Sequence, residues 1–242
     1  MGIKSGLKKK KSFLLKNGIS NSFARRLVAI DQFNEPIYRF FSDKWQADAL
    51  SDGNVWISTL ETCRQYEDPL QGDADEATET YSSGHIIGGS NDPIFVEMAS
   101  KSGIHIGEGC SNITISNCSN IKRLSDSFVL CTTKEFNPDM LSSTFGTHCV
   151  RILNPKEFFE KISIKLNQNY ALKDGLMGQV IYKSRTYTGS QQNPGPLGFV
   201  KPQDEYSAQK EFRFLWVPYN SNNLKPFLLQ CPEVSHLCEV VS

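Results

Sequence analysis

The 242-residue chain has no run of eighteen or more consecutive apolar residues, the length that a membrane-spanning helix requires. Its N-terminus is basic, and the apolar stretch there, Ser12–Leu15, is too short for the hydrophobic region of a secretory signal peptide. These absences lead us to expect a soluble, cytoplasmic protein with no membrane partner.

Several catalytic and cofactor motifs are missing as well. The chain contains no Gly-x-Ser-x-Gly nucleophile elbow, no P-loop and no glycine-rich dinucleotide fingerprint. Any binding of a dinucleotide is therefore expected to differ from the Rossmann kind.

Cysteine is present, but not in the patterns of a disulfide framework or a zinc site. The seven cysteines are odd in number and irregularly spaced. No Cys-x-x-Cys pair is available to complete four zinc ligands with Cys231, His236 and Cys238. We expect no metal site, and we expect Cys131 and Cys149, which lie in apolar runs, to be core residues.

The formal net charge of zero hides an asymmetry along the chain. Residues 1–26 carry eight basic residues and no acidic one, which leaves 18 bases and 26 acids, a difference of −8, for the remainder. A basic arm on an acidic body can contact a nucleic acid or an acidic partner. The alternative is a solvated leader without a binding role.

Hydrophobic patterning predicts an α+β protein. Short strands are expected at 37–41, 55–59, 127–133, 146–153, 178–187, 227–229 and 237–241, and helices within 17–31, 43–50 and 155–166. The strands and helices do not alternate regularly, which disfavours a doubly wound parallel sheet. We expect residues 1–31 to form a basic arm with a short helix. Residues 32–242 should form a single domain of two small packed mixed or antiparallel sheets with flanking helices, with a polar insert at 84–126.

Three separate segments carry candidate chemistry. Arg39 is a lone cation in an apolar strand, and Ser58 and Thr59 place two hydroxyl groups at the end of the next strand. Gln209 and Glu211 follow a loop rich in glycine and proline and open a run that alternates charge with bulky apolar residues. In a strand, side chains two apart point the same way, so Gln209 and Glu211 would stand side by side on one face.

In this order, the segments resemble the mono-ADP-ribosyltransferases of the arginine–serine–glutamate class, in the variant that carries glutamine-x-glutamate. The resemblance covers short segments spread over residues 37–217 and predicts an ADP-ribosyltransferase-like fold. The run Ile57–Glu61 also looks like one found in uncharacterised bacterial families. Leu60 departs from the transferase pattern, because a third hydroxyl residue often stands at that position.

The resemblance implies an enzyme that uses NAD as a substrate and needs no metal. It implies that Glu211 is the catalytic carboxylate, which would hydrogen-bond the 2′-hydroxyl of the nicotinamide ribose and stabilise an oxocarbenium-like transition state. Arg39 would bind the phosphates of NAD. Ser58 would contact the ribose, with Thr59 supporting it.

The remaining implied roles concern the acceptor. Gln209 would orient the acceptor, and glutamine at this position goes with acceptors other than arginine. Tyr206, on the preceding loop, would bind the substrate by stacking on a base or filling an apolar pocket. With the basic arm, these residues favour nucleic acid over protein as the acceptor. Compact transferases of this kind are often bacterial toxins in toxin–antitoxin or phage-defence settings, which implies an inhibitor protein as a partner.

Other interpretations of the same residues remain open. The acidic group at 67–76, with Asp73, Asp75 and Glu76, is the basis for a metal-dependent nuclease, although it matches no complete calcium loop. A binding module without catalysis is a further alternative. At the level of single residues, Ser58 or Thr59 would serve well as the N-cap of a following helix.

Overall fold

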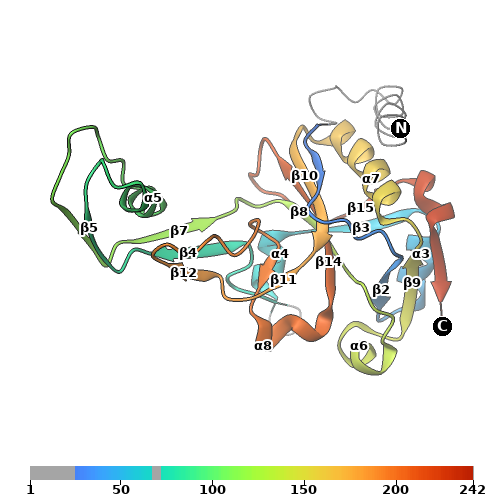
Figure 1. Cartoon of the computed structure of the whole chain (residues 1–242). Helices are drawn as coiled ribbons and strands as arrows, with labels where there is room; N and C mark the ends of the chain where they lie inside the picture. The colour runs from blue at the N-terminus through green and yellow to red at the C-terminus, as the bar shows by residue number, and fades with distance from the viewer. Residues whose placement is uncertain (1–24, 67–71, 242) are drawn as a thin grey trace, which may run out of the picture. The chain divides into compact units, whose positions relative to one another are not determined.

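The computed structural model describes residues 25–66 and 72–241. Contacts divide the chain into two compact units, drawn in Figure 1. Unit 1 comprises the described residues up to Ala74, Ser125–Val180 and those from Ala208 onward, and unit 2 comprises Asp75–Leu124 and Ile181–Ser207. None of the helices in the described ranges combines the length and the apolar character of a membrane span.

Unit 1 is built on one large sheet with helices packed against it. Its strands are β1 (Leu27–Ala29), β2 (Ile37–Phe41), β3 (Asn54–Thr59), β8 (Phe128–Thr133), β9 (His148–Ile152), β10 (Leu172–Gln179), β14 (Glu211–Pro218), β15 (Phe227–Gln230) and β16 (Cys238–Val241). Its α-helices are α3 (Lys44–Ser51), α4 (Leu60–Gln65), α6 (Pro138–Phe145) and α7 (Pro155–Asn169). A short 3₁₀ helix, Ser207–Gln209, precedes β14, and another, Pro232–Leu237, precedes β16.

The large sheet is mixed and it forks. Its strand order is β1-β10-β14-β8-β2-β9-β16, with β1 parallel to β10 and the other neighbours antiparallel. Along one edge, β8 pairs with two strands: with β3 at Ser58↔Val129 and Thr59↔Phe128, and with β2 at Tyr38↔Thr133. β3 in turn pairs with β15. The two branches therefore separate beside the middle of β8.

Local sequence explains why the helices of unit 1 begin and end where they do. Asp43 is the N-cap of α3 within a capping box completed by Gln46. Gly53, with φ +84°, follows this helix in a conformation that favours glycine. Asn154 accepts a hydrogen bond from Glu157 N at the start of α7, and Pro155 occupies the first helical position.

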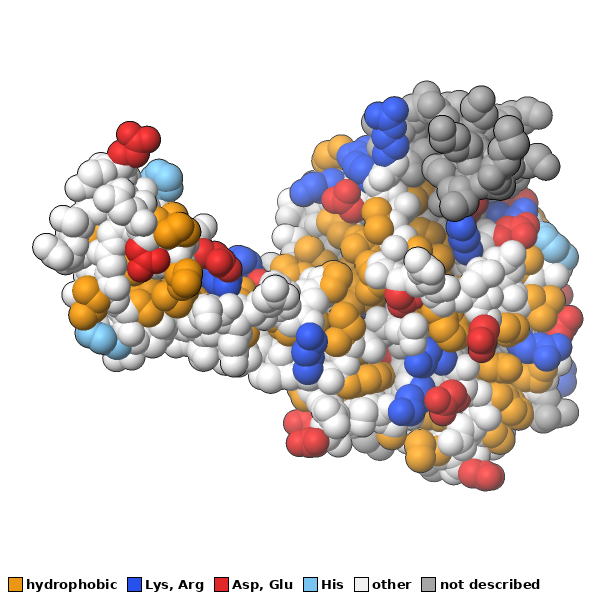
Figure 2. Space-filling model, viewed as in Figure 1, with side chains coloured by type: hydrophobic (Ala, Val, Ile, Leu, Met, Phe, Trp, Pro, Cys, Tyr) orange, Lys and Arg blue, Asp and Glu red, His pale blue; other side chains and the backbone are white. Residues whose placement is uncertain are grey.

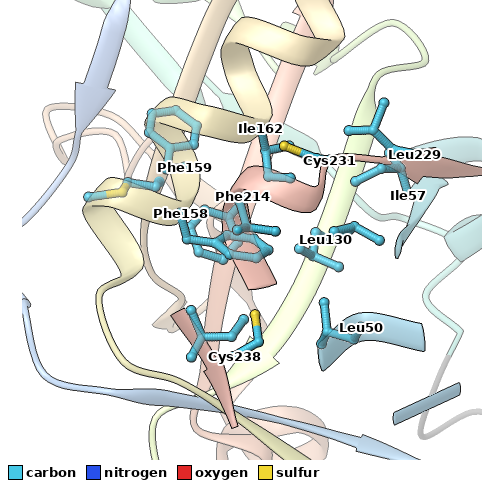
Figure 3. Close-up of a cluster of buried hydrophobic side chains, with 14 of the residues drawn as sticks. Leu50, Ile57, Leu130, Phe158, Phe159, Ile162, Phe214, Leu229, Cys231 and Cys238 are labelled. Atoms are coloured by element: carbon cyan, nitrogen blue, oxygen red, sulfur yellow. The ribbon is translucent and has the colours of Figure 1, made fainter. Parts of the chain in front are cut away.

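The core of unit 1 lies between the sheet and helix α7 (Figure 3). Phe158 and Phe159 on the helix face Phe214 and Trp216 on β14, with ring centroids 5.6–5.9 Å apart in three ring pairs. The buried indole of Trp216 donates a hydrogen bond to Ser163 Oγ at 2.8 Å, so its polar group is satisfied. This packing fixes β14 at the centre of the sheet.

Unit 2 consists of small sheets and two helices. Its strands are β4 (Thr78–Ser82), β5 (His85–Gly88), β6 (Ile113–Ser116), β7 (Ser119–Arg123), β11 (Ile181–Tyr182), β12 (Thr186–Thr188) and β13 (Val200–Lys201), and its helices are α5 (Pro93–Lys101) and α8 (Gln203–Tyr206). The pairings are β12-β4-β7, β5-β6 and β11-β13. Phe95, Ala99 and Ile115 form a small separate core between α5 and the antiparallel pair β5–β6.

The structure confirms the α+β class and the mixed and antiparallel sheets, and it corrects several details. Two small packed sheets were expected, whereas the structure has one forked nine-stranded sheet and three small sheets. The helix expected within residues 17–31 is wrong at its end, because Leu27–Ala29 is strand β1; its beginning lies outside the described residues, as does most of the basic arm. The strand expected at 178–187 is also wrong, because β10 ends at Gln179 and two short strands follow.

Candidate functional site

Glu211 is the first residue of β14 and is buried, with 4% of its surface exposed. Its Oε1 accepts a hydrogen bond from Nε of Arg213 at 2.6 Å, and Arg213 is 1% exposed. The two residues are two apart in one strand and therefore project from the same face. The carboxylate predicted to be catalytic thus lies inside the protein in a charge-assisted pair.

The segment before Glu211 departs from the expected strand. Gln209 ends the 3₁₀ helix Ser207–Gln209, and Lys210 has φ +46°, in the left-handed region. The strand begins only at Glu211, so the prediction that Gln209 and Glu211 stand side by side on one strand face is wrong. Glu211 is nevertheless fixed from both sides, since Lys134 N donates to Lys210 O and Val180 N donates to Glu211 O.

Strand β8 brings a cysteine to this face. In the β8–β14 register, Arg213 lies opposite Cys131 and Glu211 lies opposite Thr133. The Cys131 thiol is hydrogen-bonded to Cys63 of helix α4, and this bond, burial and the charge of Glu211 raise its pKa well above the ordinary value. Cys131 is therefore a neutral thiol near pH 7 and a poor nucleophile.

Arg39 lies at the fork of the sheet. Its Nη1 donates to the carbonyl oxygen of Trp56 at 3.1 Å and so links β2 to β3, and its guanidinium lies 5.1 Å from the ring centroid of Phe41. Burial lowers the pKa of Arg39 to about 10, against the opposite effects of Cys131 and Tyr66. The guanidinium therefore remains protonated at neutral pH.

The fork explains how Arg39 and Glu211 come to share a neighbour. Tyr38, rather than Arg39, is aligned with Glu211 through Thr133, so in a regular sheet Arg39 would point to the other face. Because β2 and β3 separate beside β8, the guanidinium occupies the fork instead. Cys131 interacts electrostatically with both Arg39 and Glu211. Two predicted residues that are far apart in the sequence thus act on the same thiol.

Ser58 and Thr59 end β3, as predicted, next to β8. Thr59 is 1% exposed and is the N-cap of α4: its Oγ1 accepts a hydrogen bond from Thr62 N at 3.2 Å. Ser58 is half-buried and pairs with Val129. The capping interpretation therefore holds for Thr59. Its side chain orients α4, the helix that carries Cys63 to Cys131.

Tyr206 does not occupy an exposed loop. It is the last residue of the short helix α8 in unit 2 and is 5% exposed. The ammonium group of Lys201 lies 4.7 Å from its ring centroid. Tyr206 is therefore buried beside a cation of its own unit, and the stacking of its ring on an acceptor stays a prediction.

A polar groove of about 1050 Å³ runs along the start of α4 in unit 1. It is lined by Thr59, Glu61, Thr62, Gln65, Asp126, Ser221, Asn222, Asn223, Leu224, Lys225 and Pro226. Of the six residues predicted for the site, Thr59 alone lines this groove. Asp126 Oδ1 accepts hydrogen bonds from the backbone of Glu61 and Ser127, which joins α4 to the start of β8.

The acidic group proposed for a nuclease lies partly outside the described residues, which omit 67–71. Glu76 is buried; it accepts a hydrogen bond from Ala77 N and lies 3.8 Å from Lys201 Nζ. Within the ranges that are described, no three His, Cys, Asp or Glu side chains are grouped as metal ligands.

Sequence reasoning missed two members of the cluster around Glu211. Arg213 was not singled out, although its spacing of two from Glu211 in a predicted strand places opposite charges on one face. Cys131 was expected to be an ordinary core residue; it is only half-buried, whereas Cys149 is buried as expected. No local signal links Cys131 to Cys63, because that contact depends on the packing of α4 against β8.

The surface of unit 1 has mixed charge on the face drawn in Figure 2. Lys and Arg side chains there lie among Asp and Glu side chains and hydrophobic ones, with no broad area of one sign. A nucleic-acid role for the basic arm consequently depends on residues outside the described ranges.

Comparisons with known proteins identified no relative of this chain. A scan of protein families, a search of curated proteins and a search of solved structures each found no significant match.

Proposed function

We propose that the protein is an NAD-dependent mono-ADP-ribosyltransferase that attaches one ADP-ribose to a macromolecular acceptor. The observation that carries this proposal is the register beside the fork of the large sheet, where Thr133 is aligned with both Glu211 and Tyr38, the neighbour of Arg39, and where Arg39 and Glu211 both interact electrostatically with Cys131. One group is a guanidinium suited to phosphate, and the other is a fixed carboxylate suited to a ribose.

The reaction has a simple balance of atoms and electrons. The bond between C1′ of the nicotinamide ribose and the nicotinamide nitrogen breaks, and its electron pair leaves with neutral nicotinamide. The acceptor forms a bond to C1′ and loses a proton to solvent. The transition state carries positive charge on the ribose, so a carboxylate held beside the 2′-hydroxyl lowers the barrier.

Each residue then has a role that agrees with its surroundings. Glu211 accepts the hydrogen bond of the 2′-hydroxyl and stabilises the developing charge. Arg39, protonated at neutral pH, binds phosphate oxygens of NAD. Ser58 contacts the ribose, while Thr59 holds α4 in place through its cap. Gln209, which ends the 3₁₀ helix immediately before Lys210, orients the acceptor.

For the acceptor, nucleic acid is favoured over protein. Two features support it: glutamine rather than glutamate at position 209, and the eight basic residues within 1–26. Tyr206 no longer contributes to this argument because its ring is buried. The biological setting that fits is a bacterial toxin or anti-phage effector held in check by an inhibitor protein.

The test is to incubate the purified full chain with NAD radiolabelled on the adenylate phosphate and with bacterial lysate, and then to separate nucleic acid from protein. We expect label in the nucleic-acid fraction. Arg39→Lys keeps the charge but loses the planar fork, so it should lower kcat/KM for NAD by about tenfold or more. Arg151→Gln, which removes an exposed pair with Glu239 on the same sheet, serves as the control.

The other outcomes are equally informative. Label on protein would keep the transferase and correct the acceptor. No label in either fraction, together with magnesium-dependent cleavage of nucleic acid that ignores NAD, would replace the proposal with the nuclease.

A further inference from the structure

We propose that Arg213 is a positioning residue, which holds the Glu211 carboxylate ionised and correctly oriented for the reaction. This inference rests on the proposed function, in which Glu211 is the catalytic carboxylate. It adds Arg213, which the sequence motif did not include, and it assigns a function to this buried guanidinium on β14.

The geometry of the Glu211–Arg213 pair restrains the carboxylate. The guanidinium approaches Glu211 side-on, through Nε, at 2.6 Å, a short distance that is typical of charge-assisted hydrogen bonds. Both side chains project from the same face of β14, and Cys131 lies opposite Arg213 across the β8–β14 ladder. The rigid fork of an arginine restrains the carboxylate more tightly than a flexible lysine would.

The burial of the pair has an energetic cost. Taking two charges out of water carries a large desolvation penalty for each ion, and the attraction within the pair offsets this only in part. A buried pair of this kind is therefore weak as a stability device, since apolar residues of similar volume often stabilise a fold as well or better. The pair is better explained by a role in catalysis, which needs a carboxylate that is ionised and held in a fixed position.

The backbone before Glu211 is strained. Lys210 has φ +46°, in the left-handed region that non-glycine residues rarely adopt. The surrounding hydrogen bonds hold this conformation, because Lys210 O and Glu211 O accept from Lys134 N and Val180 N. The backbone thus fixes the position of the Glu211 main chain, and Arg213 fixes the position of its carboxylate.

Charged and titratable groups around the carboxylate include Arg213 on β14 and Cys131 on β8, and Cys131 in turn interacts with Cys63 on α4 and Arg39 on β2. The thiol of Cys131 is neutral near pH 7, so the guanidinium of Arg213 supplies the charge that contacts the carboxylate. Arg213 makes direct contact with the carboxylate, whereas Arg39 is assigned to the phosphates of NAD.

The experiment compares Arg213→Lys, Arg213→Gln and the control Arg151→Gln in the full chain. We expect Arg213→Gln to lower kcat by about a hundredfold and Arg213→Lys by about tenfold, with KM for NAD little changed. Loss of the positive charge should also move the acid limb of the pH–rate profile of Arg213→Gln to higher pH by about one unit or more. The lysine variant should restore most of that shift, which a purely structural role would not do.

A second measurement does not depend on activity. The ¹³C signal of the Glu211 carboxyl group, assigned by its loss in Glu211→Gln, should titrate at higher pH in Arg213→Gln than in the wild type. If Arg213→Gln unfolds, the double variant Glu211→Gln, Arg213→Gln should recover part of the lost stability, because no lone charge remains buried.

Different results would overturn the proposed function and the positioning role of Arg213. A wild-type chain that transfers no ADP-ribose and yet shows the titration difference overturns the proposed function and keeps Arg213 as the group that holds Glu211 ionised. An active wild type whose pH–rate profile and carboxyl titration are both unchanged in Arg213→Gln overturns the positioning role.

Discussion

Each unit of the molecule contains a glutamate that is 4% exposed: Glu211 in unit 1 and Glu79 in unit 2. Glu79 lies on β4, where Oε2 accepts a hydrogen bond from Asn193 Nδ2 and Oε1 accepts one from the hydroxyl of Tyr187. Its cationic partner, Lys122, is half-exposed at 3.4 Å. These contacts tie three segments of unit 2 together with mostly neutral donors.

Glu211 has a different set of neighbours. Its partner Arg213 is as deeply buried as the carboxylate itself, and a protonated cysteine, Cys131, lies opposite Arg213 on the neighbouring strand. Burial is the same in the two cases, so burial alone does not identify a reactive carboxylate. The distinguishing feature is a buried cation in direct contact, which favours a carboxylate that stays charged.

Removing the charge from each glutamate in turn is the most direct test of the difference between Glu211 and Glu79. Glu211→Gln should lower transfer by about a hundredfold or more, because the transition state loses its counter-charge. It should also destabilise unit 1 by about 3 kcal/mol, since Arg213 remains buried without a partner charge. Glu79→Gln should cost about 1–3 kcal/mol, because one donor then faces an amide NH₂ group, and should leave transfer unchanged. Transfer assays and chemical denaturation measure the two effects.

Glu211→Asp is the companion variant in case Glu211→Gln does not fold. It keeps the charge for Arg213 but withdraws the carboxylate by one methylene, so transfer should fall while most of the stability returns. Equal losses of transfer in Glu79→Gln and Glu211→Gln would show that the two carboxylates do not differ in the way we propose.

Much of unit 1 could be predicted from local patterns. β2, β8, β9 and α7 lie within three residues of their predicted bounds, because each is an apolar run delimited by proline, glycine or a capping side chain. The same patterns located Arg39 and the Ser58–Thr59 strand end. In these segments, local preference and tertiary structure agree.

The missed features depend on contacts that are distant in sequence. β10 contains two glycines and two charged residues, a weak strand pattern, and becomes a strand because it lies between β1 and β14. Gly175 within it permits the close approach of β1, since a Cβ there would lie 2.7 Å from Leu27 Cδ2. The left-handed Lys210 and the packing of Cys63 on Cys131 likewise depend on the assembled sheet.

The two units should also differ in alkaline solution. Burial raises the pKa of Cys149, Cys231 and Cys238 in unit 1 to about 12, whereas Cys110 in unit 2 is exposed. Below pH 9 these thiols are protonated in both the folded and the unfolded state, and their contribution to stability is fully present. Between pH 9 and about 12 the unfolded state ionises first, so the free energy of unfolding falls as pH rises.

Tryptophan fluorescence can follow this effect in unit 1 alone, because all three tryptophans, at positions 45, 56 and 216, belong to that unit. The unfolding midpoint should drop by about 5 °C or more between about pH 9 and pH 11. Cys149→Ala should reduce this pH dependence. A midpoint that changes equally in the wild type and in this variant would show that the thiol does not contribute.

The finest difference between the units concerns two helix caps. Thr59 caps α4 through one hydrogen bond to Thr62 N, and Asp92 caps α5 in unit 2 through bonds to Ile94 N and Phe95 N. Thr59→Ala and Asp92→Ala should each cost about 1 kcal/mol, as the loss of an N-cap usually does. Only Thr59→Ala should also raise KM for NAD, by a few-fold, because α4 holds Cys63 against Cys131 beside the fork that contains Arg39. Hydrogen exchange of the α4 and α5 amides reports the loss of each cap, and the transfer kinetics report the KM for NAD. If both variants exchange faster and both show the same rise in KM, general loosening of the protein governs NAD binding, and not the position of α4.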